Sequence, residues 1–306
     1  MSTKSDTERA GSQNISVTDN SGTVEVPAHY AREIEARERL HQQCPVDVYV
    51  AGVNSRYSWP NRLVSAKEAR PGVADTSETL IVDSVINDPY YAVNDVLDAA
   101  HRLGADYVIG KDWPAFADPE DEGVPALDAY GWTVSKYIDH ECNAELIVPL
   151  QPPFEAPTVR SLRKQNIDHF ALGGLRDKSG PEQVQHIRAF REVAGYSVKA
   201  HGLGVGTSVE LLSALRESVA NDPQRPLLDS FDISTPETVV SKNELPNKRW
   251  DNCRFLLPTG KGSTTVRAGF SESVARMLEY ELTPGCDDEM FEQSKPKQSV
   301  QMPLNR

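Results

Sequence analysis

The stretch SVKAHGLGVGTSVELLSALRESVANDPQRPLLDSFDIS, residues 197–234, contains one complete unit of the pattern that decides the fold. An apolar run ends at His201, a glycine-rich turn follows, residues 208–219 have helical spacing, and a second apolar run ends at Asp232. This pattern is typical of two parallel strands that are joined by a helical crossover.

The same alternation continues over most of the chain. Strands are expected at Val46–Ala51, Thr79–Asp83, Asp106–Gly110, Glu145–Val148, Asp168–Leu172, Ser197–His201 and Leu228–Asp232. Helices are expected at Tyr91–Leu103, Ala126–His140, Ala156–Gln165, Pro181–Ala194 and Ser208–Val219. An eighth strand could come from Leu63–Ala66 or from Cys253–Leu257. Because no GxGxxG turn follows the first strand, these units predict an α/β fold of the (β/α)8 TIM-type barrel class rather than an open doubly wound sheet.

The composition of the chain ends indicates which segments lie outside the barrel, and the net charge indicates which partners are disfavoured. Residues 1–23 are expected to form a disordered polar tail, residues 24–283 a single barrel domain, and residues 284–306 a second polar tail. The chain shows neither a secretory leader nor the ~20 apolar residues of a membrane helix, so we expect a cytoplasmic protein without membrane contact. The net charge of −13 disfavours unselective binding of polyanions.

The segment from Lys242 to Arg267 reverses the sign of that charge. It holds six basic and two acidic residues, a local charge of +4. Lys242, Lys248, Arg249 and Arg254 are therefore predicted to contact nucleic-acid phosphates, since such contacts dominate nucleic-acid binding. The alternative is a solvated loop whose lysines only balance nearby acids.

The four cysteines give no sign of a metal site. Cys44, Cys142, Cys253 and Cys286 are far apart and form no CxxC pair. We therefore predict free thiols, no bound metal and no cofactor.

Two aspartates lie where a parallel barrel carries its chemistry, at the carboxyl ends of strands. Asp83 and Asp232 each end an expected strand. Carboxylates on two separate strands can divide the work of glycosyl transfer, because one can attack the anomeric carbon while the other moves protons. Alternatively, each could cap the segment that follows it.

Further candidates follow the other strands. Asp112 and Gln151 could hydrogen bond to the edge of a purine, and Gly173–Gly174 would let a flat base approach the backbone. The turn His201–Thr207, which contains three glycines, could contact a phosphate or ribose. Alternatively, Gln151 could be a surface glutamine, the glycine-containing segments could be tight turns, and His201 could be a structural histidine.

The order of these motifs resembles the tRNA-guanine transglycosylase superfamily. Its motifs match residues about 79 to 245 here, as Asp83-Ser84 for proton transfer, Gln151 for base reading, Gly173-Gly174-Leu175, Gly204-Val205-Gly206-Thr207, and Asp229-Ser230-Phe231-Asp232 with the nucleophile. The resemblance implies a pentosyltransferase that exchanges bases through a covalent aspartyl–glycosyl intermediate. It implies catalytic roles for Asp83 and Asp232, and substrate contacts by Ser84, Gln151, Gly173, Gly174, Leu175 and Gly204. Asp112 and His201, which follow or end other strands, are further expected substrate contacts.

The chain also departs from this family. The family's zinc-ligand motif CxCxxC is not in the sequence, and Val85-Ile86-Asn87 replaces the usual Gly-Gly-Phe after Asp83-Ser84. A compact zinc-free form is more similar to the phage-type and archaeal-virus-type enzymes that insert 7-deazaguanine into DNA. DNA and the free 7-deazaguanine base are therefore the expected partners.

Other functions stay open at this point. A tRNA-guanine transglycosylase of archaeosine or queuosine type would use the same site residues. A non-catalytic nucleic-acid-binding subunit could share the barrel, and the sequence leaves open a homodimer or a partner protein. An unrelated barrel that binds a sugar phosphate would explain the glycines but not the two aspartates.

Overall fold

The computed structural model describes residues 14–19, 22–27, 41–52, 59–85, 91–112, 129–236, 238, 245–246, 252–253, 275 and 278–284. Contacts divide the chain into two compact units, one of Met1–Gln43 with Gly285–Arg306 and one of Cys44–Pro284.

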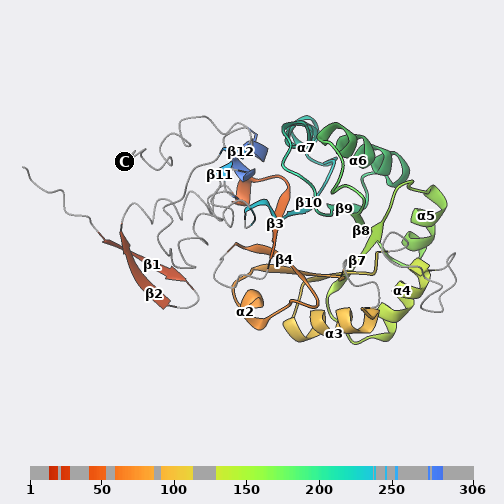
Figure 1. The fold of residues 1–306 in the computed structure, drawn as a ribbon, viewed down its shortest axis with the longest axis horizontal. Helices are drawn as coiled ribbons and strands as arrows, with labels where there is room; N and C mark the ends of the chain where they lie inside the picture. Colours follow the sequence, from red (N-terminus) through yellow and green to blue (C-terminus); the bar gives the residue numbers. More distant parts are fainter. Residues whose placement is uncertain are drawn as a thin grey trace, which may run out of the picture. The chain divides into compact units, whose positions relative to one another are not determined.

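The larger unit is built on a closed barrel of parallel strands in the order β10-β3-β4-β5-β6-β7-β8-β9 (Figure 1). The strands are β3 (Asp47–Ala51), β4 (Asn61–Ser65), β5 (Thr79–Asp83), β6 (Tyr107–Ile109), β7 (Glu145–Leu150), β8 (His169–Leu172), β9 (Lys199–Gly202) and β10 (Ser230–Ile233). The helices described between them are α2 (Pro71–Ala74), α3 (Val93–Leu103), α4 (Ala129–Asp139), α5 (Ala156–Lys164), α6 (Gly180–Ala194) and α7 (Val209–Asn221). The predicted (β/α)8 TIM-type barrel is confirmed.

Strand β4 settles the question of the eighth strand. It pairs with β3 and β5, and the register aligns Ser65 with Asp83. Cys253 instead belongs to a short antiparallel pair of β11 (Leu245–Pro246) and β12 (Asn252–Cys253), which is separate from the barrel. The alternative strand Cys253–Leu257 is therefore wrong as a barrel strand.

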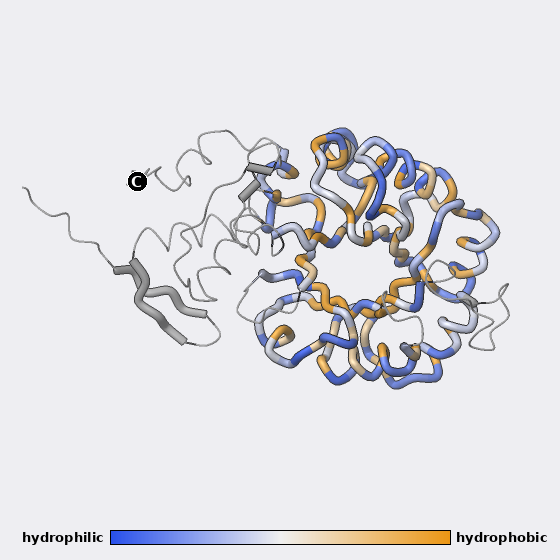
Figure 2. The backbone as a smooth tube through the Cα atoms, in the orientation of Figure 1, coloured by the Kyte–Doolittle hydropathy of each residue, from blue (hydrophilic) through white to orange (hydrophobic). Residues whose placement is uncertain are grey.

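Side chains that alternate along the strands fill the inside of the barrel, as expected for a small closed barrel. They form a cluster of Tyr49, Leu63, Ile81, Ile109, Ile147 and Ala171. Figure 2 shows the ring of strands largely in hydrophobic colours and the outward turns of the helices largely in hydrophilic ones. The interior is thus a packed core, so a functional site is expected at the ends of the strands.

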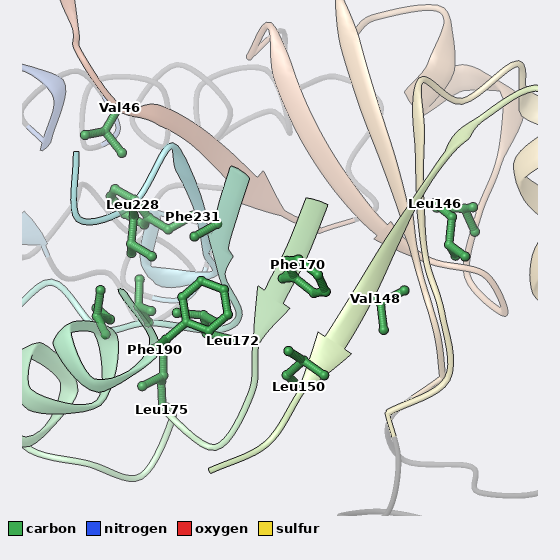
Figure 3. Close-up of a cluster of buried hydrophobic side chains, with 14 of the residues drawn as sticks. Val46, Leu146, Val148, Leu150, Phe170, Leu172, Leu175, Phe190, Leu228 and Phe231 are labelled. Atoms are coloured by element: carbon green, nitrogen blue, oxygen red, sulfur yellow. The ribbon is translucent and has the colours of Figure 1, made fainter. Parts of the chain in front are cut away.

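A second apolar layer joins the strands to the helices. Phe190 of α6 meets Phe170 of β8 at 5.9 Å and Phe154 edge-to-face at 5.4 Å between ring centroids. Leu172 and Leu175 are buried in the same cluster (Figure 3). Because α6 is anchored in this way, it fixes the loop that leaves β8.

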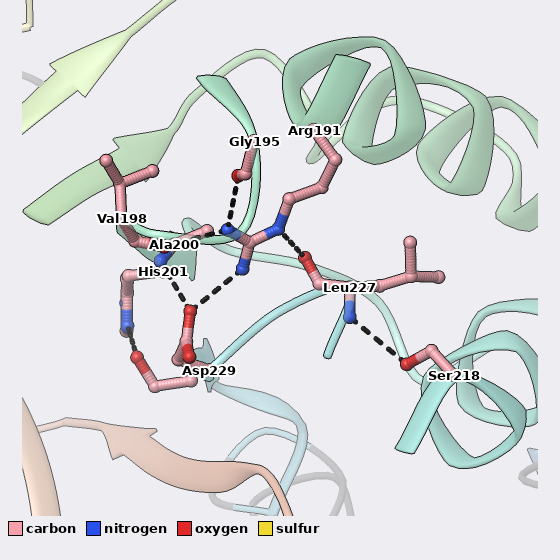
Figure 4. Close-up of polar contacts among 9 residues, drawn as sticks. Arg191, Gly195, Val198, Ala200, His201, Ser218, Leu227 and Asp229 are labelled. Atoms are coloured by element: carbon pink, nitrogen blue, oxygen red, sulfur yellow. Dashed lines mark hydrogen bonds and ion pairs between the residues drawn. The ribbon is translucent and has the colours of Figure 1, made fainter. Parts of the chain in front are cut away.

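A buried arginine holds the other side of α6 (Figure 4). The Arg191 guanidinium donates to the carbonyl oxygens of Leu227, Gly195 and Val198 at 2.9, 3.2 and 2.8 Å. It also pairs with Asp229 Oδ2 at 2.8 Å. This network ties α6 to the segment that leads into β10.

Arg191→Met is expected to lower the free energy of unfolding by about 3 kcal/mol, because buried acceptors lose their donors. Urea unfolding at constant slope measures this as a shift of the midpoint. Arg225→Met is the matched control: Arg225 is exposed and lies 3.7 Å from Asp222, so its loss should change stability by less than about 1 kcal/mol. Equal effects of both substitutions would show that the network does not anchor α6.

The smaller unit contains an antiparallel pair, β1 (Asn14–Asp19) with β2 (Gly22–Pro27). Its register pairs Ile15 with Val26 and Val17 with Val24. The disordered tail expected for residues 1–23, the barrel domain at residues 24–283 and the tail at residues 284–306 stay predictions.

None of the helices in the described ranges is long and apolar enough to cross a membrane.

Candidate active site

The carboxyl ends of four barrel strands bring the predicted polar residues to one rim. Asp83 ends β5 and Asp232 lies in the second half of β10. Asp112 follows β6 and Gln151 follows β7 directly. The side chains of Asp83 and Asp232 share the parity of the interior residues on their strands, so both face the barrel axis.

Asp83 is the most perturbed acid of this group. It is half-buried at the rim. Burial, then the carboxylates of Asp232 and Asp112, raise the pKa of Asp83 well above its usual range, whereas hydrogen bonds from Ser84 act the other way. The three carboxylates therefore sense one another, and Asp83 is the one favoured to keep its proton.

Asp112 and Gln151 form a single hydrogen-bonded unit. Gln151 Nε2 lies 2.7 Å from both carboxylate oxygens of Asp112. Burial raises the pKa of Asp112 to about 6, although the hydrogen bond from Gln151 opposes this. Asp112 is thus a buried acceptor that is ionised at neutral pH and has lone pairs left for a ligand.

Gly173 and Gly174 leave room for the Gln151 side chain. A Cβ at Gly173 would overlap the amide of Gln151, and one at Gly174 would lie 2.8 Å from Gln151 Oε1. Gly174 also has a φ of 68°, which L side chains rarely adopt. Because neither glycine has a side chain, the Gln151 amide has the space it needs to contact Asp112.

Asp232 is buried and held through one oxygen. Its Oδ1 accepts the backbone N–H of Gly204 at 2.7 Å and lies 3.4 Å from His201 Nε2. Gly204 comes from the glycine-rich turn after β9, with a φ of 55°. The turn therefore directs the amide of Gly204 to the carboxylate of Asp232.

Three of the expected substrate contacts are buried in this structure. Leu175 is fully buried in the helix-facing core, and its carbonyl already accepts from Gln183 at 2.8 Å. His201 is also fully buried and contacts Asp232 rather than solvent. Ser84 lies beside Asp83 with its hydroxyl 3.5 Å from Oδ1.

Two further residues, which were not predicted from the sequence, contact this site. Ser230 Oγ lies 2.8 Å from His201 Nδ1, and the Tyr49 ring meets the His201 ring edge-on at 5.6 Å. The spacing of Ser230 and Asp232 on one strand was a usable signal, because residues two apart face the same side. The contact of Tyr49 depends on barrel closure and had no local signal.

The four predicted phosphate contacts, Lys242, Lys248, Arg249 and Arg254, lie outside the described residues. Within the described part of the chain, no three or more His, Cys, Asp or Glu side chains are grouped so as to hold a metal ion. No protein-family model matches the chain, and no curated protein matches it closely.

Proposed function

We propose that this protein is a transglycosylase that replaces guanine in DNA with a 7-deazaguanine base through a covalent bond to Asp232. The observation that carries the proposal is the contrast between two carboxylates at one rim. Asp232 accepts a fixed N–H donor, whereas the pKa of Asp83 is raised. Different surroundings for two acids are the usual basis of separate nucleophile and proton-transfer roles.

In the first displacement, a carboxylate oxygen of Asp232 bonds to C1′ of the deoxyguanosine and the C1′–N9 bond breaks. The electron pair stays on N9 of guanine, which takes the proton of Asp83. A carboxyl with a raised pKa is suited to this step because it keeps its proton to a higher pH than an ordinary carboxyl does.

In the second displacement, N9 of the incoming base gives its proton to the Asp83 carboxylate and attacks C1′. The bond from C1′ to Asp232 breaks, and its electron pair returns to the carboxylate. Both acids end as they began, and two inversions at C1′ give retention.

The unit of Asp112 and Gln151 supports recognition of the base. Asp112 can accept from the N1–H and 2-amino groups of a guanine-like ring, while Gln151 orients the carboxylate. The small residues Gly173 and Gly174 keep the neighbouring space free of side chains. The nucleotide must leave the base stack to reach this rim, at a typical cost of a few kcal/mol. We place the activity in the cytoplasm.

Isotope exchange tests the proposal and its main alternative together. Purified protein is incubated with labelled guanine and either DNA or tRNA, and both polymers are then analysed by nucleoside mass spectrometry. We expect label in DNA, and replacement of guanine when the free 7-deazaguanine base is supplied. Label in tRNA alone would assign the protein to the tRNA-acting group, and label in neither polymer would contradict base exchange.

The pKa of Asp112 predicts how binding of the free base depends on pH. Protonation removes acceptor capacity, so the affinity for 7-deazaguanine should fall as the pH drops through about 6. Below that point the expected loss approaches about tenfold per pH unit. Calorimetric titrations at several pH values measure it. Asp112→Asn should bind weakly with no such pH dependence, and a flat profile in the parent would rule out Asp112 as the acceptor.

A further inference from the structure

His201 lies inside the barrel, in direct contact with the strand that carries Asp232. It belongs to β9, where its backbone pairs with that of Ser230 on β10. Its side chain is fully buried, and the edge-to-face contact with Tyr49 fixes the plane of the ring. His201 lies close to the proposed nucleophile. Because its imidazole is closed to solvent, it does not itself touch substrate.

The two ring nitrogens of His201 face different partners. Nδ1 lies 2.8 Å from Ser230 Oγ. Nε2 is buried without a hydrogen bond from the described residues, and Asp232 Oδ1 lies 3.4 Å from it. A serine hydroxyl can donate as well as accept, so Ser230 can donate to Nδ1 and leave the ring proton on Nε2. The proton then points at the carboxylate.

Asp232 is restrained on one oxygen only. Oδ1 accepts from Gly204 N at 2.7 Å and faces His201 Nε2. Among the described residues, no hydrogen bond reaches Oδ2. Two donors on Oδ1 would fix the rotation of the carboxylate and leave the lone pairs of Oδ2 for bonding to carbon.

We propose that His201 is a positioning residue for Asp232, in the Nε2–H tautomer selected by Ser230, and that Oδ2 is the atom that attacks C1′. The inference rests on the proposed function, which does not specify the attacking oxygen of Asp232, and assigns that role to Oδ2. In the covalent intermediate Oδ1 is a carbonyl oxygen, and negative charge returns to it as the C1′–Oδ2 bond breaks. A donor that is already in place stabilises that charge and favours the second displacement.

The tautomer can be measured without any activity. The ¹⁵N resonances of the His201 ring, assigned from their absence in His201→Gln, distinguish Nε2–H from Nδ1–H. We expect Nε2–H in the parent and loss of that preference in Ser230→Ala. A ring protonated on Nδ1 alone in the parent would overturn the proposal.

Kinetics test the consequence of that tautomer. His201→Met removes the donor but fills the space, and it should lower kcat by about 100-fold with little change in KM, as expected for a misplaced nucleophile. His201→Gln places an amide N–H toward Asp232 and should recover activity to within about tenfold of the parent. The matched control is His169→Met, since His169 is a buried barrel histidine that pairs with Glu145 instead.

The outcomes separate this inference from the proposed function. A parent without exchange refutes the proposed function, while the tautomer measurement still decides the contact. An active parent with an unchanged kcat in folded His201→Met refutes the positioning role alone. If His201→Met does not fold, Ser230→Ala decides the question: a lower kcat at unchanged KM supports the role, and parent-like kcat refutes it.

Discussion

Asp232→Ala is expected to abolish base exchange and to leave the fold intact. The substitution removes the atom that bonds to C1′ in the proposed mechanism, so turnover should fall by on the order of 10⁴-fold or more. Among the described residues, the Gly204 amide loses its hydrogen bond, while the neighbouring strands β3 and β9 keep their pairing with β10. Denaturing electrophoresis with labelled DNA should show a covalent complex for the parent and none for the variant.

Asp168→Ala is the matched control for that experiment. Asp168 is an exposed carboxylate that directly precedes β8, at the amino end of the strand and so on the opposite face of the barrel. Its removal changes the net charge equally but should leave exchange unchanged, because barrel chemistry lies at the other face. Near-parental exchange by Asp232→Ala would remove the nucleophile assignment.

Asp83→Asn is expected to stop turnover, although a covalent complex that forms slowly should still be detectable. An amide can neither give a proton to the leaving guanine nor take one from the incoming base, so both displacements slow, and we expect a loss of about 10²- to 10⁴-fold in kcat. Rapid-quench experiments that separate guanine release from incorporation of the new base measure the two steps. An active Asp83→Asn protein would show that the proton moves through another group.

Stability provides an independent check on Asp83→Asn. Because its pKa is raised in the folded state, the carboxyl of Asp83 destabilises the fold once it ionises. That destabilisation is absent below pH 3.8, where the group is protonated in both states, and grows as the pH rises toward the raised pKa. The melting temperature of Asp83→Asn should therefore equal or exceed that of the parent at neutral pH. A lower value would point to a structural role.

Most strands and helices could be predicted from local patterns because each follows a simple periodicity. The strand predicted at Thr79–Asp83 has the bounds of β5, and the expected helix at Pro181–Ala194 matches α6 to within one residue. Strand β4 was predicted only as one of two alternatives because its start is polar, and β1, β2 and α2 were not predicted. Arg62 is fully buried in β4, since its guanidinium donates to the carbonyls of Val50 and Gly52 at 3.3 and 2.9 Å. Backbone acceptors on a neighbouring strand cannot be identified from one sequence.

The candidate site was predictable in part for the same reason. Strand ends indicate which residues reach the rim, and this placed Asp83, Asp112, Gln151 and Asp232 together. The interior role of His201 could not be predicted, because it depends on the register that sets His201 opposite Ser230. Register between strands that are distant in sequence is determined by barrel closure, and no local spacing indicates it.

The most direct test of the proposed mechanism is to find which residue carries the sugar in the covalent intermediate. The protein is incubated with DNA without a second base, denatured, digested with protease and nuclease, and analysed by peptide mass spectrometry. The proposed mechanism predicts a deoxyribosyl group on the peptide that contains Asp232, at the side chain of that residue, and its loss when 7-deazaguanine is added before denaturation. A deoxyribosyl group on Asp83, or exchange that proceeds with no adduct on any residue, would contradict it.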